Sequence, residues 1–228
     1  FNRGRHVDYS RFKDEFYTVV YPQEKTDALI VWKAIRTFLK GSIEAFQQTD
    51  GVLTREYFVG EQLGKIRCKV PLHLRDSLYD IFLQYQQWMS EQHLWDDCDR
   101  IFALLKGCEN AKKSHSQVFE EDVRKTRLYV DEVQDYLQIE ILLFFHIGGG
   151  PGALFLAGDP AQSVVEGTDF RFEEIRSVGH YVAGDRRHLI PEKPKVVNIN
   201  FRSHAGVLKC AGGFLDLLFA HFPGTKEL

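Results

Sequence analysis

Two short apolar runs in this chain end in carboxylate side chains. Asp131 and Glu132 directly follow the run 128–130. Asp159 follows a second run, 154–157, after one glycine. Such runs are typical of buried parallel strands, and open α/β sheets bind their ligands where those strands end. Two adjacent acids at a strand end predict a magnesium–nucleotide site, in which one carboxylate holds the metal's shell and the other polarises water.

The part of the chain that must position these acids alternates between strand and helix signals. From residue 127 onward, strands are predicted at 127–131, 153–157 and 195–199, and helices at 135–146, 171–177 and 203–222. This alternation predicts an α/β fold, with a mostly parallel sheet and flanking helices. Asp135 lies at the start of the first of these helices, where an acid is a good N-cap.

Residues 1–110 lack this alternation and are predicted to form an all-helical insert. Apolar side chains at helical spacing predict helices within 26–40 and within 71–106. Gly41 is a candidate C′ glycine that ends the first of them. A short strand or extended segment is expected at 17–21.

The end of the insert is predicted from glycine and charge. Gly107 is expected to close the helices, and 109–121 to be a polar linker. The acids Asp96, Asp97 and Asp99 fit the start of the second long helix, because the helix dipole favours acids there. A metal cluster formed by these acids is the alternative interpretation.

The composition limits the class of protein. With 228 residues, 44% of them hydrophobic and 13% aromatic, the chain can bury a sizeable core. A formal net charge of −3 excludes a global cationic field, so any groove for a nucleic-acid strand has to be local. The four cysteines lack disulfide or zinc spacing, which favours an intracellular location, nuclear or cytoplasmic. The longest apolar run, 139–147, is about half of what a membrane span needs, so no membrane partner is expected.

Three motifs at the predicted strand ends resemble those of the superfamily 1 helicases of the UvrD/Rep type. Asp131–Asp135 (DEVQD) is similar to the DExQD form of the Walker B motif, Gly158–Ser163 (GDPAQS) to GDxxQS, and Asn200–Ser203 (NFRS) to NYRS. The stretch 167–177 is most similar to the helicase-like region of large tetratricopeptide-and-ankyrin-repeat proteins. The resemblance implies the P-loop NTPase fold: a partial RecA-like parallel sheet with flanking helices, plus the all-helical insert.

The resemblance also implies ATP and Mg²⁺ as cofactors, and it gives roles to residues at the first two strand ends. Asp131 and Glu132 would hold the metal, and Glu132 would also orient or deprotonate the attacking water. Gln162 would sense the terminal phosphate, with Asp159 beside it. Gln134 is a candidate for coupling this site to the neighbouring motifs, a role that the sequence leaves open.

Two further pairs of residues would serve the nucleotide and the nucleic acid. Arg202 would reach the γ-phosphate and stabilise negative charge there, and Phe201 would stack on the nucleotide base. The tyrosine and tryptophan that stack on nucleic-acid bases in the family are missing after Ser163. Phe170 and Arg171 are the nearest aromatic–arginine pair, and they are the expected contacts to single-stranded DNA or RNA.

One motif of the family is absent. The sequence contains no GxxxxGK[ST] segment, and the glycine run 148–152 precedes a strand and lacks a Lys-Ser/Thr pair, so it is predicted to be a turn. The chain is therefore expected to be a piece of a longer helicase whose flanking domains are its partners. The expected divisions are a helical insert (1–110), the second part of the first RecA-like domain (111–190) and the entry to the second (191–228).

The expected function is that of a portion of an ATP-dependent helicase or translocase. The lysine and the hydroxyl group of the GxxxxGK[ST] motif, which bind the phosphates and the metal, are missing. The isolated chain is therefore expected to bind ATP weakly or not at all, and not to unwind nucleic acid. A non-catalytic scaffold or interaction module that keeps the helicase fold is the alternative. A metal-dependent nuclease that uses Asp131, Glu132 and Asp159 is a further alternative.

Overall fold

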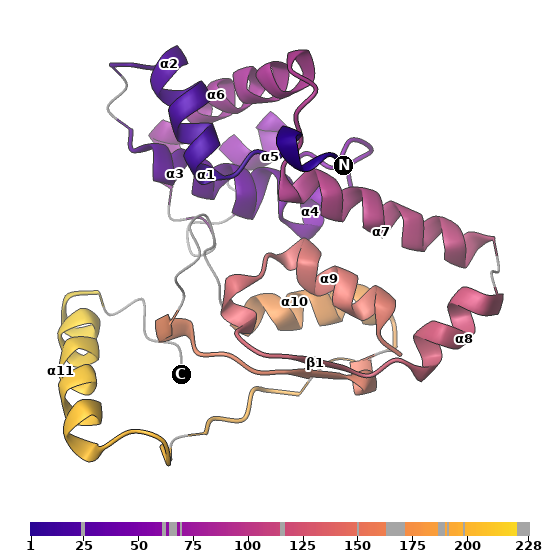
Figure 1. The fold of residues 1–228 in the computed structure, drawn as a ribbon, viewed down its shortest axis with the longest axis vertical. Helices are drawn as coiled ribbons and strands as arrows, with labels where there is room; N and C mark the ends of the chain where they lie inside the picture. The colour runs from indigo at the N-terminus through magenta and orange to yellow at the C-terminus, as the bar shows by residue number, and fades with distance from the viewer. Residues whose placement is uncertain are drawn as a thin grey trace.

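The computed structural model of the chain describes residues 1–23, 26–60, 63, 68, 70–114, 117–149, 151–162, 172–186, 190, 192–197 and 199–222. Within this part the protein is mostly helical and contains a two-stranded parallel sheet. Figure 1 shows the N-terminal helices above the sheet, and α11 to one side at the end of an extended segment. None of the described helices is both long and apolar enough to cross a bilayer.

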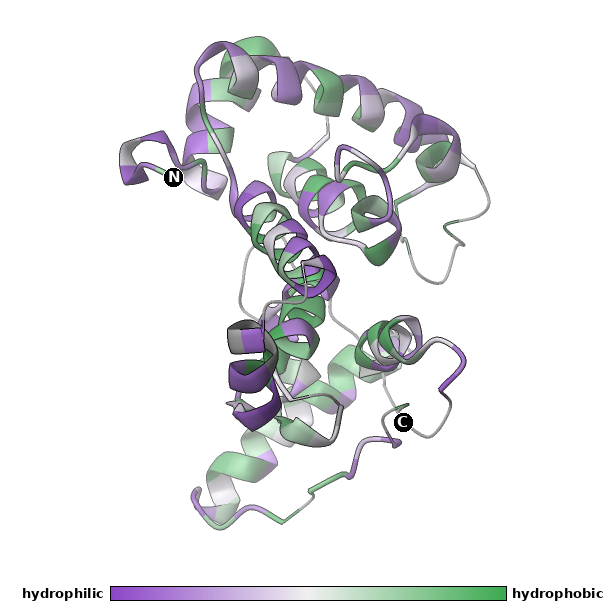
Figure 2. Ribbon diagram, turned by 90° about the vertical axis from the view of Figure 1, so that its right-hand side faces the viewer, coloured by the Kyte–Doolittle hydropathy of each residue, from purple (hydrophilic) through white to green (hydrophobic). Residues whose placement is uncertain are grey.

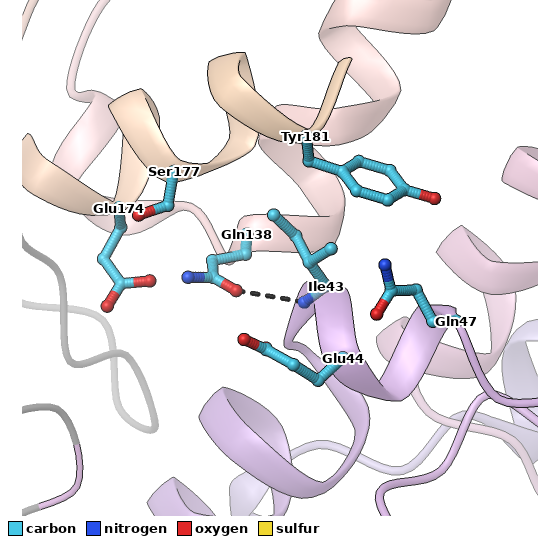
Figure 3. Close-up of a pocket in the computed structure, with 7 residues that line it drawn as sticks. All are labelled: Ile43, Glu44, Gln47, Gln138, Glu174, Ser177 and Tyr181. Carbon is cyan, nitrogen blue, oxygen red and sulfur yellow. Dashed lines mark hydrogen bonds between the residues drawn. The ribbon is translucent and has the colours of Figure 1, made fainter. Parts of the chain in front are cut away.

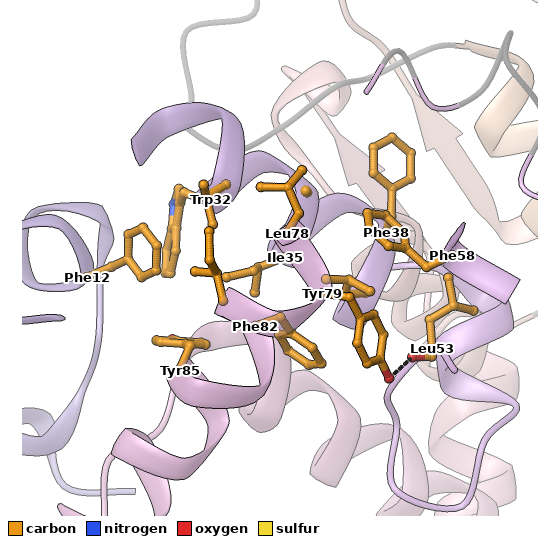
Figure 4. Close-up of a cluster of buried hydrophobic side chains, with 14 of the residues drawn as sticks. Phe12, Trp32, Ile35, Phe38, Leu53, Phe58, Leu78, Tyr79, Phe82 and Tyr85 are labelled. Carbon is orange, nitrogen blue, oxygen red and sulfur yellow. Dashed lines mark hydrogen bonds between the residues drawn. The ribbon is translucent and has the colours of Figure 1, made fainter. Parts of the chain in front are cut away.

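The N-terminal part consists of helices around an aromatic core. The helices are α1 (Tyr9–Arg11), α2 (Thr18–Val20), α3 (Ala28–Lys33), α4 (Ile43–Phe46), α5 (Arg55–Val59), α6 (Leu72–Glu91) and α7 (Asp97–Lys113). The buried residues of α7, and Ile43 and Phe46 of α4, belong to a second core instead. Phe12 packs against Trp32 and Tyr85, with ring centroids 5.0 and 5.4 Å apart (Figure 4). In Figure 2 hydrophobic and hydrophilic residues alternate along the long helices, as expected for elements that bury one face.

The strand expected at 17–21 is wrong, because this segment is helical. A π-helical stretch, Phe12–Tyr17, leads directly into α2. Phe12, Phe16 and Tyr17 are all buried, and only a helical backbone turns side chains at this spacing toward one core. Val19 and Val20 are β-branched, a type common in strands, but both are exposed, and no strand of the described sheet pairs with this segment.

The end of the helical part also differs from the prediction. Gly107 lies inside α7, which continues to Lys113, and the expected linker contains most of α8 (Gln117–Lys125). A glycine inside a helix costs only about 1 kcal/mol relative to alanine. The packing of α7 outweighs this cost, because Ile101 and Leu105 are buried in a core shared with α9 (Gln138–Ile147).

Gly41 does end the first long helical segment, but not as a left-handed C′ glycine. A second π-helical stretch, Ala34–Lys40, extends α3 up to this residue. The φ angle of Gly41 is −94°, which any residue can adopt. A Cβ at this position would overlap the carbonyl oxygen of Arg36, so glycine is needed for close packing rather than for its backbone freedom.

The sheet pairs the two strands that precede the acidic motifs. β1 (Leu128–Val130) and β2 (Leu154–Leu156) run parallel, with Tyr129 opposite Phe155, and α9 connects them. Helix α10 (Phe172–Ala183) packs against α9. Tyr129 and Phe155 are 79% and 62% exposed, so the strands are covered on one face only in the described part of the chain. The expectation of strands buried on both faces is therefore too strong.

The third predicted strand is absent from the described residues. Residues 192–197 and 199–200 have no regular structure, and Val196, Val197 and Ile199 are exposed. A strand needs a hydrogen-bonded neighbour, and the described residues offer this segment none. Helix α11 (Ala205–His221) follows close to the predicted position, but none of its residues is buried.

Candidate functional site

The ends of the two strands are held together beyond the sheet itself. The backbone N–H of Ala157 donates to the carbonyl oxygen of Val130 at 2.9 Å, and that of Val133 donates to the carbonyl oxygen of Ala157 at 2.9 Å. These bonds place Asp131 and Glu132 beside the loop that begins at Gly158. Asp131 and Glu132 therefore lie next to the GDPAQS motif, as expected if the two motifs serve the same site.

The two acids at the end of β1 are exposed and conformationally constrained. Glu132 has φ 54° and ψ 42°, in the left-handed region. Such a backbone is unfavourable for a residue other than glycine, and it costs roughly 1–3 kcal/mol. The Asp131 carboxylate accepts a hydrogen bond from the N–H of Glu132 at 3.0 Å. Two adjacent, accessible carboxylates of this kind offer the hard oxygen ligands that Mg²⁺ prefers.

Gln134 joins the two motifs directly. Its side chain is fully buried, its Nε2 donates to Glu132 Oε2 at 2.6 Å, and its Oε1 accepts from the N–H of Asp159 at 2.9 Å. There is no space between the loops, since a Cβ at Gly158 would overlap Gln134 Oε1 and lie 2.9 Å from a methyl group of Val133. The glycine before Asp159 is thus required by the buried amide.

Asp159 fixes the loop that carries Gln162. One of its carboxylate oxygens accepts from the N–H of Ala161 at 3.0 Å, and the other accepts from Gln162 Nε2 at 2.7 Å. The structure therefore brings Asp131, Glu132, Asp159 and Gln162 into one hydrogen-bonded region.

The predicted N-cap role of Asp135 is wrong. Helix α9 begins at Gln138, and Glu140 accepts a hydrogen bond from the N–H of Leu137 at 2.8 Å. A 3₁₀ turn, Val133–Asp135, follows the acids and delays the start of the helix. The helix starts where Leu137 can be buried, at 3% exposure, rather than at the first residue with a capping side chain. Burial raises the pKa of Glu140, although the hydrogen bond from Leu137 opposes this rise.

Arg202 and Phe201 are not brought to the acids in this structure. Phe201 is 93% exposed. The backbone N–H groups of Arg202 and Ser203 donate to Asn200 Oδ1 at 2.9 and 2.8 Å, which forms a local turn before α11. Among the described residues, the segment before this turn does not join the sheet, so Phe201 and Arg202 are not held at the strand ends. Phe170 and Arg171 lie outside the described residues.

The acids at the start of α7 have a structural role. Asp96 and Asp99 cap the helix reciprocally, each accepting from the other's N–H at 3.0 Å. Lys40 Nζ lies 2.6 Å from a carboxylate oxygen of each acid. Burial by itself raises the pKa of Asp96, but the Lys40 ammonium more than offsets this and holds it below its usual value. No group of three or more His, Cys, Asp or Glu in the described part of the chain is arranged to hold a metal.

A cavity of about 290 Å³ lies elsewhere, between α4, α9 and α10 (Figure 3). It is lined by Ile43, Glu44, Gln47, Gln138, Glu174, Ser177 and Tyr181. Gln138 Oε1 accepts from the N–H of Ile43 at 3.0 Å, which ties α9 to the helical part. None of the predicted site residues lines this cavity, and no motif in the sequence points to it apart from the position of Gln138 shortly after the acidic motif.

Comparison with known proteins agrees with the motifs. Residues 46–172, more than half of the chain, match the UvrD/REP helicase N-terminal domain. The human TPR and ankyrin repeat-containing protein 1 is 33% identical over an alignment that covers 97% of this chain and 8% of that protein. This similarity confirms the predicted resemblance to the large repeat proteins, of which the chain spans only a small part. No solved structure matches the chain. The chain belongs to the UvrD/REP helicase family.

Proposed function

We propose that the chain is a portion of an ATP-dependent helicase or translocase, and that its strand-end residues handle the Mg²⁺ ion and the terminal phosphate of ATP. The observation that carries this proposal is the placement of Asp131 and Glu132, exposed at the end of β1, against the loop of Asp159 and Gln162. Their chemistry fits, because Mg²⁺ is commonly bound through one or two carboxylates with waters in its remaining positions.

The strand-end residues would have different roles toward the cation, the water and the phosphate. Asp131 and Glu132 would hold the metal, which when bound neutralises phosphate charge. Glu132 would also orient the attacking water and accept its proton. Gln162 would contact the terminal phosphate through its neutral amide, from the position that Asp159 gives it.

Arg202 and Phe201 would act from the second RecA-like domain. We assign the helical insert to 1–110, the second part of the first RecA-like domain to 111–190 and the entry to the second to 191–228. In this arrangement, Arg202 and Phe201 reach the nucleotide only when the second domain closes on the first. Single-stranded DNA or RNA would be the partner, with Phe170 and Arg171 as proposed contacts.

A non-catalytic scaffold is the second candidate function. It is favoured by the positions of Phe201 and Arg202, which make no contact with the acids. A nuclease is supported less well, because both carboxylate oxygens of Asp159 already accept hydrogen bonds from its own loop.

ATP hydrolysis tests the proposal, measured with and without single-stranded nucleic acid and beside Glu132→Gln. Since the 228 residues contain no GxxxxGK[ST] segment, we expect no hydrolysis by this chain alone. Hydrolysis that requires Glu132 would contradict the expectation that phosphate binding is incomplete, and it would rule out the scaffold as well. A scaffold also predicts no hydrolysis, so Mn²⁺ binding decides between the two: the proposal requires binding that Asp131→Asn abolishes, and equal binding by wild type and Asp131→Asn would refute it.

A further inference from the structure

We propose that Gln134 is a positioning residue, which couples the binding of a divalent cation at Asp131 and Glu132 to the conformation of the loop 159–162. This inference rests on the proposed function, because it assumes that these two acids bind the cation. It adds a defined path between the cation site and the residue that would sense the phosphate.

The side chain of Gln134 is suited to this role by its two different ends. The position requires a hydrogen-bond donor facing the Glu132 carboxylate and an acceptor facing the N–H of Asp159. The amide of Gln134 supplies both. The reversed orientation would place oxygen against oxygen and NH₂ against N–H. The buried amide is therefore held in one orientation, and a glutamate here would place a second carboxylate against Glu132.

The path continues beyond Asp159 without a gap. The Asp159 carboxylate accepts from the N–H of Ala161 and from Gln162 Nε2. These groups have little room to move independently. Gly158 packs closely against Gln134, and the N–H of Val133 donates to the carbonyl oxygen of Ala157. A movement of the Glu132 carboxylate toward a cation weakens or redirects its bond to Gln134. The amide must then adjust, and the N–H of Asp159 moves with it.

Magnetic resonance of the backbone amides tests this coupling. We would titrate the ¹⁵N-labelled chain with Mg²⁺ alone, as wild type, Gln134→Met and Gln134→Glu. The control is Gln138→Met. This variant also removes a buried glutamine, but one that accepts a hydrogen bond from Ile43 and lies outside the hydrogen-bonded path Glu132–Gln134–Asp159–Gln162, which we call the relay. In the wild type and the control, Mg²⁺ should shift the amides of Asp131 and Glu132 together with those of Asp159 and Ala161. In both Gln134 variants the shifts at Asp159 and Ala161 should be lost, while those at Asp131 and Glu132 remain.

The outcomes separate this inference from the proposed function. Shifts at Asp159 that persist in Gln134→Met, or that are missing in the wild type while Asp131 and Glu132 respond, overturn the relay alone. A wild type that does not respond at Asp131 and Glu132 overturns the proposed cation site and the relay with it. Should the variants not fold, the Gln134 side-chain NH₂ of the wild type decides: a relay requires that its resonances shift with Mg²⁺, and unchanged resonances refute it.

Discussion

Replacing Lys40 by methionine should destabilise the helical part severely. The Lys40 ammonium lies 2.6 Å from Asp96 and from Asp99, and the side chains of Lys40 and Asp96 are only 3% and 2% exposed. Tyr85 donates a further hydrogen bond to Asp96 at 3.1 Å, so three helical segments meet at this carboxylate. Methionine keeps most of the volume but leaves the Asp96 charge buried without a counter-charge. Breaking a buried pair in this way costs about 3–5 kcal/mol, which is a large share of the roughly 5–15 kcal/mol that stabilises a typical domain.

Urea denaturation followed by tryptophan fluorescence measures this cost, because Trp32 is buried near Tyr85. The matched control is Lys13→Met at an exposed position of the π-helical stretch Phe12–Tyr17, which should change the free energy of unfolding by less than about 0.5 kcal/mol. The double variant Lys40→Met/Asp96→Asn should recover part of the loss, because asparagine still caps α7 and carries no charge. A loss below about 1 kcal/mol in Lys40→Met would refute the reasoning, since it would mean that Asp96 reaches solvent or another cation.

Two further predictions concern the sheet and its crossover helix. Gly158→Ala should destabilise the chain by about 1–3 kcal/mol, because the new methyl group overlaps the Gln134 amide; Gly152→Ala, where a Cβ meets nothing within 4 Å, is the control in the same denaturation experiment. Burial and the nearby Lys112 lower the pKa of His146 from 6.5 to about 4. As the pH falls, the imidazole of His146 is therefore protonated first in the unfolded chain. The free energy of unfolding should be highest above about pH 6.5 and should decrease as the pH falls to about 4. His146→Gln should flatten the pH dependence of stability in this range, and an unchanged slope would contradict the assignment.

The sequence located the strands and the last helix because their signals are local. The runs predicted at 127–131 and 153–157 contain β1 and β2, and the helix predicted at 203–222 contains α11. In each case an apolar run is bounded by charged residues, glycine or a capping residue within a few positions, and no distant contact is needed to read it.

The errors arose where distant contacts decide the structure. The apolar residues 195–199 have strand propensity, but a strand forms only with a neighbour, and the described part of the chain provides none. Asp135 has the right side chain for an N-cap, but the burial of Leu137 sets the start of α9. Gln134 is a candidate for coupling the motifs, but its hydrogen bond to an amide 25 positions away could not be predicted from a local pattern.

The central claim is that Asp131 and Glu132 bind the divalent cation of a nucleotide site. Electron paramagnetic resonance of free Mn²⁺ tests it most directly, with the wild-type chain, Asp131→Asn, and Asp185→Asn as an exposed control that lies outside the site. The wild type and Asp185→Asn should both reduce the free Mn²⁺ signal, and Asp131→Asn should not. Equal binding by wild type and Asp131→Asn would contradict the claim.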